Sequence, residues 1–410
     1  MTDPRVHDVV IVGAGPAGAA VAARLHQHGV RDVVVLDRYD FPRDKPCGGG
    51  LTGHIDEALA AVDLQLTVPS VASPAATVRF GSFERTVTMG RPVRVIRRIE
   101  FDASLVEQVR AKGVEIRTGV AVDELAVAGD HVALKLGGGG QLAAKIVVGA
   151  DGAASVVRKH LTGNAKALPH RLFMAELPAA AAATVTPAGA LRGDAMVYDF
   201  TAMAEGLRGY VWLFPVAGDR VNVGLMHYPS SRRGGPELLA LLRKHLEPYG
   251  VALPAKGSRG WPVWGYHPSA PVSAPRLLTV GDAAGIDGLT GEGIAVAMEQ
   301  AQVAGDAIAR ALSTGEVGFA GYRRALRKAV VGRELALDRH LARLLYQHGP
   351  AWQRWLSLVL FDPDVLEMYA ARVAGTEVLA DQKARLWGAL VRHGFAARRR
   401  RRELTAAVAR

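Results

Sequence analysis

A glycine-rich segment near the start of the chain has the spacing of a phosphate cradle. Residues 13–18 read Gly-Ala-Gly-Pro-Ala-Gly and lie between an apolar stretch, Asp8 to Gly13, and an Ala-rich stretch, Pro16 to His28. Glycines at these positions allow a tight turn and a close approach of the backbone to a pyrophosphate, beside the positive end of a helix. Asp37 ends a second apolar stretch, where a carboxylate can bind a ribose diol. We therefore expect a bound dinucleotide.

Two further segments indicate which dinucleotide is bound. Gly149-Ala150-Asp151-Gly152 follows an apolar stretch, and Gly281-Asp282-Ala283-Ala284-Gly285 precedes Gly291-Glu292-Gly293-Ile294 at a predicted helix start. An acid just past a buried strand can bind polyol hydroxyls, and the amides of 291–294 can meet negative charge on a flavin ring. NAD requires neither segment, so the pattern favours FAD. The alternative is that both segments are ordinary loops between strands and helices.

These motifs must be positioned by a large α/β fold. The chain has 410 residues, of which 49% are hydrophobic and 22% are charged, a globular composition that excludes disorder, collagen and coiled coil for the whole chain. We expect a discontinuous Rossmann-like FAD-binding domain at residues 1–165 and 270–320. An antiparallel β-sheet domain for the substrate is expected at 166–269, followed by a helical C-terminal region at 321–410 with a basic tail.

The predicted substrate domain contains a strand with aromatic residues at alternate positions. Tyr210 and Trp212 fall on one face of this strand, and Val211 and Leu213 fall on the other. An aromatic strip of this kind suits an apolar, elongated ligand, because ligand pockets are mainly apolar. It suits a protein core equally well, so both interpretations stay open.

Together, the Gly13 to Gly18, Gly149 to Gly152 and Gly281 to Ile294 segments resemble the FAD-dependent oxidoreductases of the para-hydroxybenzoate hydroxylase type. This resemblance covers about Val9 to Leu312. Two narrower segments are similar to the geranylgeranyl reductase family: Phe41-Pro42-Arg43-Asp44-Lys45-Pro46-Cys47-Gly48-Gly49-Gly50-Leu51 and Tyr210-Val211-Trp212-Leu213-Phe214-Pro215. The sequence departs from that family's pattern at Leu207, where the family has a proline.

The resemblance implies a set of site residues. Asp37 would bind the adenosine ribose, Arg98 the phosphate region of FAD, and Asp282 its ribityl or pyrophosphate portion. Cys47 and the glycines after it would lie beside the isoalloxazine. The residues expected to bind FAD are Gly13, Gly15, Ala17, Gly18, Asp37, Arg38, Cys47, Gly48, Arg98, Val122, Asp151, Gly152, Asp282, Gly291, Gly293 and Ile294. Those expected at the substrate are Tyr210, Trp212 and Phe214, and no metal site is expected.

Cys47 is the candidate catalytic residue. A thiol beside a reduced flavin could donate a proton, and three consecutive glycines after it let the backbone approach a flat ring. The alternative is that Cys47 is a small buried residue. His54 could also relay a proton, or lie on a helix surface. Because Cys47 is the only cysteine, no internal disulfide can form, and we expect a cytoplasmic protein.

The resemblance implies that reduced flavin delivers hydride to C=C bonds of an isoprenoid or similar lipid. The alternative is an FAD-dependent monooxygenase, a hydroxylase or epoxidase of a secondary-metabolite pathway, because one fold serves both chemistries. Halogenation is disfavoured, because flavin-dependent halogenases rely on a lysine downstream of the nucleotide motif and none lies between Lys45 and Lys112. A non-catalytic flavoprotein is a third interpretation. No second nucleotide motif identifies the external electron donor, which could be NAD(P)H or a ferredoxin.

The net charge of +11 is concentrated near the C-terminus, where Val391 to Arg410 holds seven arginines and one acidic residue. Because the rest of the chain is only mildly basic, we do not expect nucleic-acid binding. The Arg398 to Arg402 run has two interpretations. It is either a solvated tail or a peripheral contact with anionic lipid at the inner face of the membrane.

Overall fold

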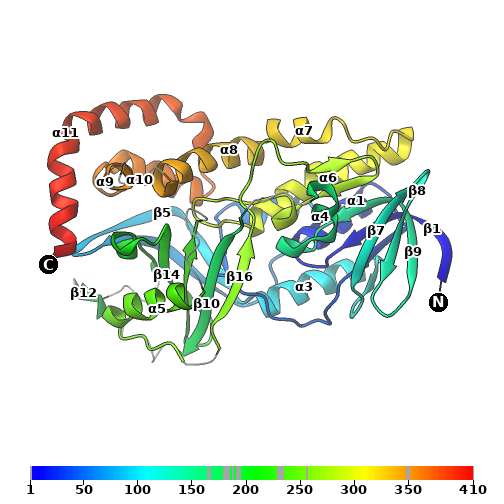
Figure 1. Ribbon diagram of the computed structural model, residues 1–410, viewed down its shortest axis with the longest axis horizontal. Coiled ribbons are helices and arrows are strands. Elements are labelled where there is room, and N and C mark those ends of the chain that lie inside the picture. The colour runs from blue at the N-terminus through cyan, green and yellow to red at the C-terminus, as the bar shows by residue number, and fades with distance from the viewer. Residues whose placement is uncertain are drawn as a thin grey trace.

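Two sheets of eight strands each form the frame of the computed structural model (Figure 1). The structure describes residues 2–163, 168–178, 185–186, 189–190, 195–228, 235–254, 257–347 and 351–409. The two ends of the chain lie at opposite ends of the long axis. A short ribbon of two strands, β11 (Val185–Thr186) and β12 (Gly189–Ala190), stands apart from both sheets.

The first sheet contains the predicted βαβ unit. Its main path runs in the order β17 (Ser273–Ala274), β18 (Leu277–Thr279), β9 (Gln141–Gly149), β1 (Thr2–Val12), β2 (Val33–Leu36) and β6 (Glu115–Arg117). All neighbours from β18 to β6 are parallel. The hairpin of β7 (Val122–Ala128) and β8 (His131–Leu136) joins antiparallel to β9. Strand β2 is buried along its whole length, as expected for a parallel strand covered on both faces.

Helices cover both faces of this sheet. Residues of α1 (Pro16–Gln27), α3 (Arg98–Ala111) and α6 (Ile294–Thr314) join one face in a single apolar cluster. The short α4 (Val156–Thr162) packs with β7, β8 and β9 in a second cluster. Since α6 is distant in sequence from α1, the first domain is built from separated parts of the chain.

The second sheet is mostly antiparallel. Its strands follow the order β16 (Arg259–Val263), β10 (His170–Pro178), β15 (Arg220–His227), β14 (Gly209–Val216), β13 (Ala195–Asp199), β4 (Ser70–Phe80), β5 (Phe83–Ile96) and β3 (Gly50–Leu51). Two expectations need correction. The pair of β13 and β4 is parallel, and residues 70–96, which we expected within the FAD-binding domain, hydrogen-bond into this second sheet. The long pairing of β4 with β5 therefore extends the sheet that we predicted for residues 166–269.

The region after residue 321 is helical, as predicted. It consists of α7 (Tyr322–Lys328), α8 (Val330–Ala342), the π-helical turn 343–347, α9 (Trp352–Phe361), α10 (Pro363–Val373) and α11 (Lys383–Ala409). Asp362 caps α10 by accepting a hydrogen bond from the Asp364 amide at 3.2 Å, and Pro363 occupies its first turn. The remaining helices are α2 (Ile55–Ala60) and α5 (Gly235–Leu246). Side chains of α9 and α10 share an apolar cluster with strands of the second sheet.

Candidate functional site

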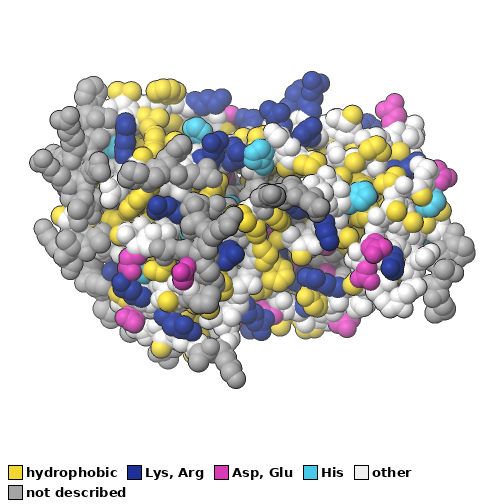
Figure 2. Space-filling model, viewed as in Figure 1, with side chains coloured by type: hydrophobic (Ala, Val, Ile, Leu, Met, Phe, Trp, Pro, Cys, Tyr) yellow, Lys and Arg dark blue, Asp and Glu magenta, His cyan; other side chains and the backbone are white. Residues whose placement is uncertain are grey.

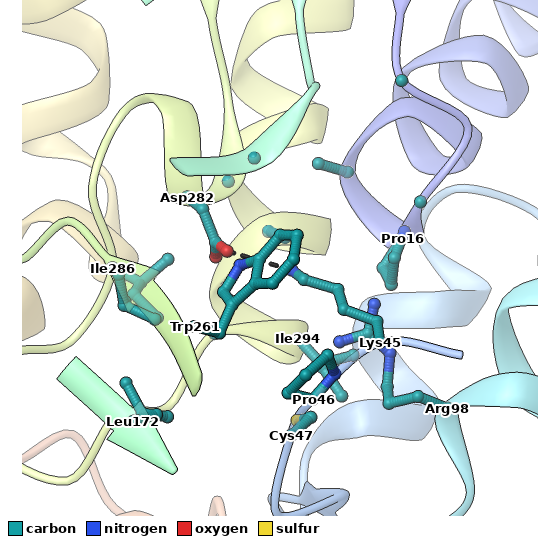
Figure 3. Close-up of a pocket in the computed structure, with 18 of the residues that line it drawn as sticks. Pro16, Lys45, Pro46, Cys47, Arg98, Leu172, Trp261, Asp282, Ile286 and Ile294 are labelled. Carbon is teal, nitrogen blue, oxygen red and sulfur yellow. Dashed lines mark hydrogen bonds and ion pairs between the residues drawn. The ribbon is translucent and has the colours of Figure 1, made fainter. Parts of the chain in front are cut away.

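A cavity of about 550 Å³ opens between the two sheets. Its wall combines the first β–α turn, the segment after Asp37, the two glycine-rich loops and the aromatic strand β14. Figure 3 shows side chains from the first β–α turn, the segment after Asp37 and the loop of Asp282 pointing toward one another. All the residues that we expected to bind FAD line this cavity except Gly18, and so do Tyr210, Trp212 and Phe214.

The first glycine motif brings a strand end and a helix start into close contact. Gly13 has φ +103°, and a Cβ there would lie 2.4 Å from the Ala150 carbonyl oxygen. A Cβ on Gly18 would lie 1.8 Å from the Gly13 carbonyl oxygen, which explains why Gly18 packs behind the cavity instead of lining it. Asp37 accepts hydrogen bonds from the Ala14 amide at 2.8 Å and from the Tyr39 amide at 3.0 Å. These bonds hold the Asp37 carboxylate at the cavity wall.

One carboxylate oxygen of Asp151 is available to accept a hydrogen bond from a ligand in the cavity. Its Oδ2 accepts a hydrogen bond from the Val156 amide at 2.7 Å, whereas its buried Oδ1 has no partner among the described residues. Burial raises the pKa of Asp151 to about 6. A buried acceptor without a partner is costly, so this oxygen fits a ligand that carries hydroxyl groups. Together with the glycine cradle, it makes the cavity suited to FAD.

Arg98 is a fixed cation at the cavity wall. Its Nε and Nη2 each donate to one oxygen of Asp102 at 2.7 Å, and Arg43 Nη1 lies 3.1 Å from the same carboxylate. Burial opposes ionisation of Asp102, but attraction to Arg98 and the hydrogen bonds from it outweigh burial and lower the pKa of Asp102. The pair arises locally, because Arg98 and Asp102 are one turn apart on α3.

Three consecutive charged residues anchor the segment that precedes Cys47. Arg43 contacts Asp102 of α3, Asp44 pairs with Arg259 of β16, and Lys45 Nζ lies 3.0 Å from Asp282 Oδ2. Figure 3 shows the bond between Lys45 and Asp282 passing beside Trp261. We assigned no role to Arg43 or Lys45 from the sequence, although both lie in the family-like segment. Their alternation with Asp44 is the signal that could have identified them.

The loop of Cys47 rests on the aromatic strand. Cys47 Sγ accepts a hydrogen bond from the Gly49 amide at 3.3 Å. Asn222 of β15 donates through Nδ2 to the Cys47 carbonyl at 2.8 Å and accepts through Oδ1 from Trp212 Nε1 at 2.8 Å. A Cβ on Gly48 would lie 2.9 Å from the Phe214 ring. Asn222, which sequence reasoning missed, therefore joins the candidate catalytic loop to the candidate substrate wall.

The aromatic residues alternate as the strand pattern predicts. Tyr210, Trp212 and Phe214 face the cavity and join one apolar cluster, whereas Val211 and Leu213 join another on the opposite face. The ring of Tyr198 lies 5.4 Å from that of Tyr210 and 5.2 Å from that of Phe214. The Tyr210 hydroxyl donates to the Thr290 carbonyl, which fixes this side chain against the second glycine-rich loop. Leu207, the departure from the family pattern, is fully buried behind the sheet.

Several predicted features lie outside the cavity. His54 does not line it and instead has Nε2 3.7 Å from Glu299 Oε1. Residues 398–402 belong to α11, but their side chains lie outside the described part of the structure. Figure 2 shows Lys and Arg side chains spread over the visible face instead of gathered on one element.

In the part of the chain that the structure describes, no group of three or more His, Cys, Asp or Glu side chains is placed to hold a metal ion. Across the same residues, no helix combines the length and the apolar character that crossing a membrane requires.

Comparisons with known proteins agree with the geometry of the cavity. Residues 6–328 match the family model described as FAD binding domain. The menaquinone reductase of Mycolicibacterium smegmatis is 29% identical over 93% of this chain and 95% of its own length. The digeranylgeranylglycerophospholipid reductase of Methanosarcina mazei is 28% identical over 76% of this chain and 77% of its own.

Solved structures share the fold. A geranylgeranyl bacteriochlorophyll reductase-like protein from Thermoplasma acidophilum superposes with a TM-score of 0.72 at 18% identity, over 94% of this chain and 100% of its own. A flavin-dependent halogenase superposes with a TM-score of 0.66 at 23% identity, over 95% of this chain and 77% of its own. With the family match, the glycine cradle and the acceptor on Asp151 in place, the chain belongs to the FAD binding domain family, is an FAD-dependent oxidoreductase, and is similar to proteins of the geranylgeranyl reductase type.

Proposed function

We propose that this protein reduces C=C bonds of an isoprenoid or isoprenoid-like lipid with hydride from its reduced FAD. The observation that carries the proposal is the aromatic wall of Tyr210, Trp212 and Phe214, which shares one cavity with the residues suited to FAD. Because ligand pockets match the polarity of their ligands, an aromatic wall favours an apolar ligand. The reductases that are similar in sequence act, by their names, on menaquinone and on a digeranylgeranyl lipid, which supports this substrate class.

The protein's own part in the reaction is placement and shielding. Bound FAD would supply the redox chemistry, and the residues that would hold it are those of the glycine cradle, Asp37, Asp151 and the 291–294 turn. The aromatic wall would orient the alkene, and the buried rings would exclude water. Asn222 would fix the distance between that wall and the Cys47 loop. Cys47 would be able to protonate the second carbon.

Anaerobic reoxidation tests this function. The FAD-loaded enzyme is reduced with dithionite, and geranylgeranyl compounds or menaquinone are then added without oxygen. We expect the flavin absorbance to return and a product with fewer double bonds to form. If the flavin is reoxidised only by oxygen and the product is hydroxylated, the enzyme is a monooxygenase and the proposal is wrong.

Two variants extend this test to the predicted site. Cys47→Ala examines the thiol, with Cys47→Ser as the matched variant that keeps a hydrogen-bonding group. Full turnover in Cys47→Ala would remove the thiol from the mechanism. The electron donor is identified by mixing the oxidised enzyme with NADPH, NADH or a reduced ferredoxin and following the loss of flavin absorbance.

We further propose a peripheral contact with the cytoplasmic face of a membrane through α11. Trp387 and Val391 lie one helical turn apart, and their exposed fractions are 68% and 55%. Exposed apolar side chains on a helix that also carries the Arg398 to Arg402 run suit anionic lipid. We expect binding to anionic liposomes to fall in Trp387→Ser, while turnover with detergent-dispersed substrate stays unchanged. Equal liposome binding by both proteins would contradict this contact.

A further inference from the structure

A buried cluster of charges lies behind the glycine turn that precedes α6. Arg372 of α10 donates through Nε to Glu334 at 2.7 Å and through Nη1 to Glu292 at 3.2 Å, and its Nη2 pairs with Asp338. We call these four residues the Arg372 cluster. The exposed side-chain fractions are 7% for Arg372, 9% for Glu292, 12% for Glu334 and 0% for Asp338. One cation therefore faces three carboxylates away from water.

This cluster contains more carboxylates than its cation can compensate. Glu299 adds a fourth carboxylate, and burial, followed by repulsion from Glu292, raises its pKa to about 8. Burial also raises the pKa of Asp338 well above its ordinary value, although Arg372 opposes this effect. Like charges close together in a buried site oppose one another's ionisation, so Glu299 and Asp338 are the carboxyl groups that retain protons most readily.

Asp338 gives independent geometric support for a stored proton. Its Oδ1 is buried and has no hydrogen-bond partner among the described residues. An ionised carboxylate with a bare buried oxygen is strongly disfavoured, whereas the neutral acid is tolerated better. The geometry of the cluster therefore favours retention of a proton.

Glu292 connects this cluster to the cavity. Its Oε1 accepts a hydrogen bond from Thr52 Oγ1 at 2.6 Å, and both Glu292 and Thr52 line the cavity. Thr52 belongs to the same segment as Cys47. Titratable and charged groups from several elements influence Glu292 and its neighbours. They are His54 just before α2, Glu299 of α6, Glu334 and Asp338 of α8, Tyr369 and Arg372 of α10, Tyr198 of β13 and Asp287 of the loop before α6.

We propose that the Arg372 cluster stores the proton consumed in C=C reduction, and that Glu292 delivers it into the cavity. This inference rests on the proposed function, in which one alkene carbon receives hydride from the reduced cofactor. The other carbon receives the carboxyl proton of Glu292 in place of a proton from Cys47, and the Cys47→Ala and Glu292→Gln variants distinguish the two donors. The O–H bond breaks as the C–H bond forms, and its electron pair stays on the carboxylate. Arg372 and Thr52 stabilise the resulting charge, and Glu292 regains its proton from the cluster.

Glu292→Gln tests the delivery step. The amide keeps the size of the side chain and can still bond to Thr52 and Arg372, but it cannot release a carboxyl proton. In the anaerobic assay with prereduced enzyme, we expect reoxidation by the alkene to slow about 100-fold or more, the usual range for loss of a general acid. Reoxidation is measured at saturating FAD and expressed per bound flavin, so that the rate reports the delivery step and not cofactor binding. The matched control is Glu316→Gln, an exposed glutamate just after α6, which reoxidises at the wild-type rate.

A spectral titration tests storage without any substrate. Flavin absorbance responds to nearby charge, so the oxidised enzyme is titrated from about pH 6 to about pH 10, a range chosen to bracket the raised pKa of Glu299. We expect a shift with a midpoint near 8 in the wild type, from Glu299, and its loss in Glu299→Gln. An unchanged titration in Glu299→Gln, or wild-type reoxidation of Glu292→Gln at every pH, overturns the inference. If no alkene reoxidises the wild type, the proposed function fails, and the titration still decides whether the cluster holds a proton.

Discussion

Replacing Asp102 with asparagine tests whether the buried ion pair with Arg98 fixes the cavity wall. Asp102 is fully buried and accepts two hydrogen bonds of 2.7 Å from Arg98, and Arg43 lies 3.1 Å away. Asp102→Asn leaves the buried Arg98 guanidinium without its counter-charge, whereas Arg43 keeps Asp37 at 3.9 Å, and breaking a buried pair such as that of Arg98 costs about 3 to 5 kcal/mol. With an unfolding entropy of about 2.1 cal/mol/K per residue, a chain of this length then loses about 3 to 6 °C in Tm.

The pH dependence of this loss follows from the lowered pKa of Asp102. A carboxyl group whose pKa is lower in the folded state contributes stability above its unfolded pKa of about 3.9, and this contribution disappears as the pH falls through the folded value. The difference in unfolding free energy between wild type and Asp102→Asn is therefore constant from pH 7 to about pH 5. It shrinks below about pH 4.

Asp306→Asn is the matched control for this experiment. Asp306 also contacts two basic side chains, Arg24 and His28, each at 2.7 Å, but it is 52% exposed. Because exposed pairs contribute little, we expect a loss of less than about 1 kcal/mol. Both variants are unfolded thermally and with urea at saturating FAD, followed by circular dichroism. Equal losses in the two variants would refute the assignment of Asp102 as a structural counter-charge.

Three further predictions address the cradle, the wall and the pH response. In Gly18→Ala the new Cβ would lie 1.8 Å from the Gly13 carbonyl oxygen. We therefore expect FAD affinity, measured by flavin fluorescence, to fall at least about tenfold, or 1.4 kcal/mol. Unchanged affinity would contradict the proposal that this turn binds FAD. Trp212→Phe leaves Asn222 Oδ1 without its donor and lowers stability by about 1 to 3 kcal/mol in urea unfolding, whereas a neutral effect would mean that this bond is dispensable. Burial lowers the pKa of His170 to about 4. The unfolded chain therefore binds a proton that the native chain excludes, and the free energy of unfolding falls by about 1.36 kcal/mol per pH unit as the pH drops below about 6.5. This pH dependence of the free energy of unfolding should be absent in His170→Phe.

The glycine turn between β1 and α1 was predictable from local patterns, and the binding of FAD by its residues stays a prediction. The turn at Gly13 to Gly18 depends on residues that are neighbours in sequence, and its steric requirements leave few alternatives to glycine. Asp37 was also predictable, because a βαβ unit brings the end of its second strand next to the first turn. The alternation along β14 set the cavity-facing side of Tyr210 and Trp212, although no local pattern could distinguish a cavity from a core.

Long-range pairings were beyond local patterns. Strands β4 and β13 pair in parallel across a long stretch of chain, and neither sequence carries a signal for its partner. The same holds for Arg372, which lies on an ordinary amphipathic helix and contacts Glu292 only because the tertiary fold brings α10 to the loop before α6. Asn222 was missed for a similar reason, since its partners come from two other segments. Such contacts depend on the tertiary fold.

The order of strands in the first sheet has a consequence during translation. Strand β1 emerges early from the ribosome, but it lies between β2 and β9, and β9 pairs in turn with β18, which ends at Thr279. At about 5 to 20 residues per second, the 13–18 turn waits roughly 15 to 55 s for the helix that starts at Ile294. During that interval the apolar face of α1 has no partner in α6. The nascent chain therefore exposes this apolar face until most of it has been synthesised, which favours contact with other apolar surfaces in the meantime.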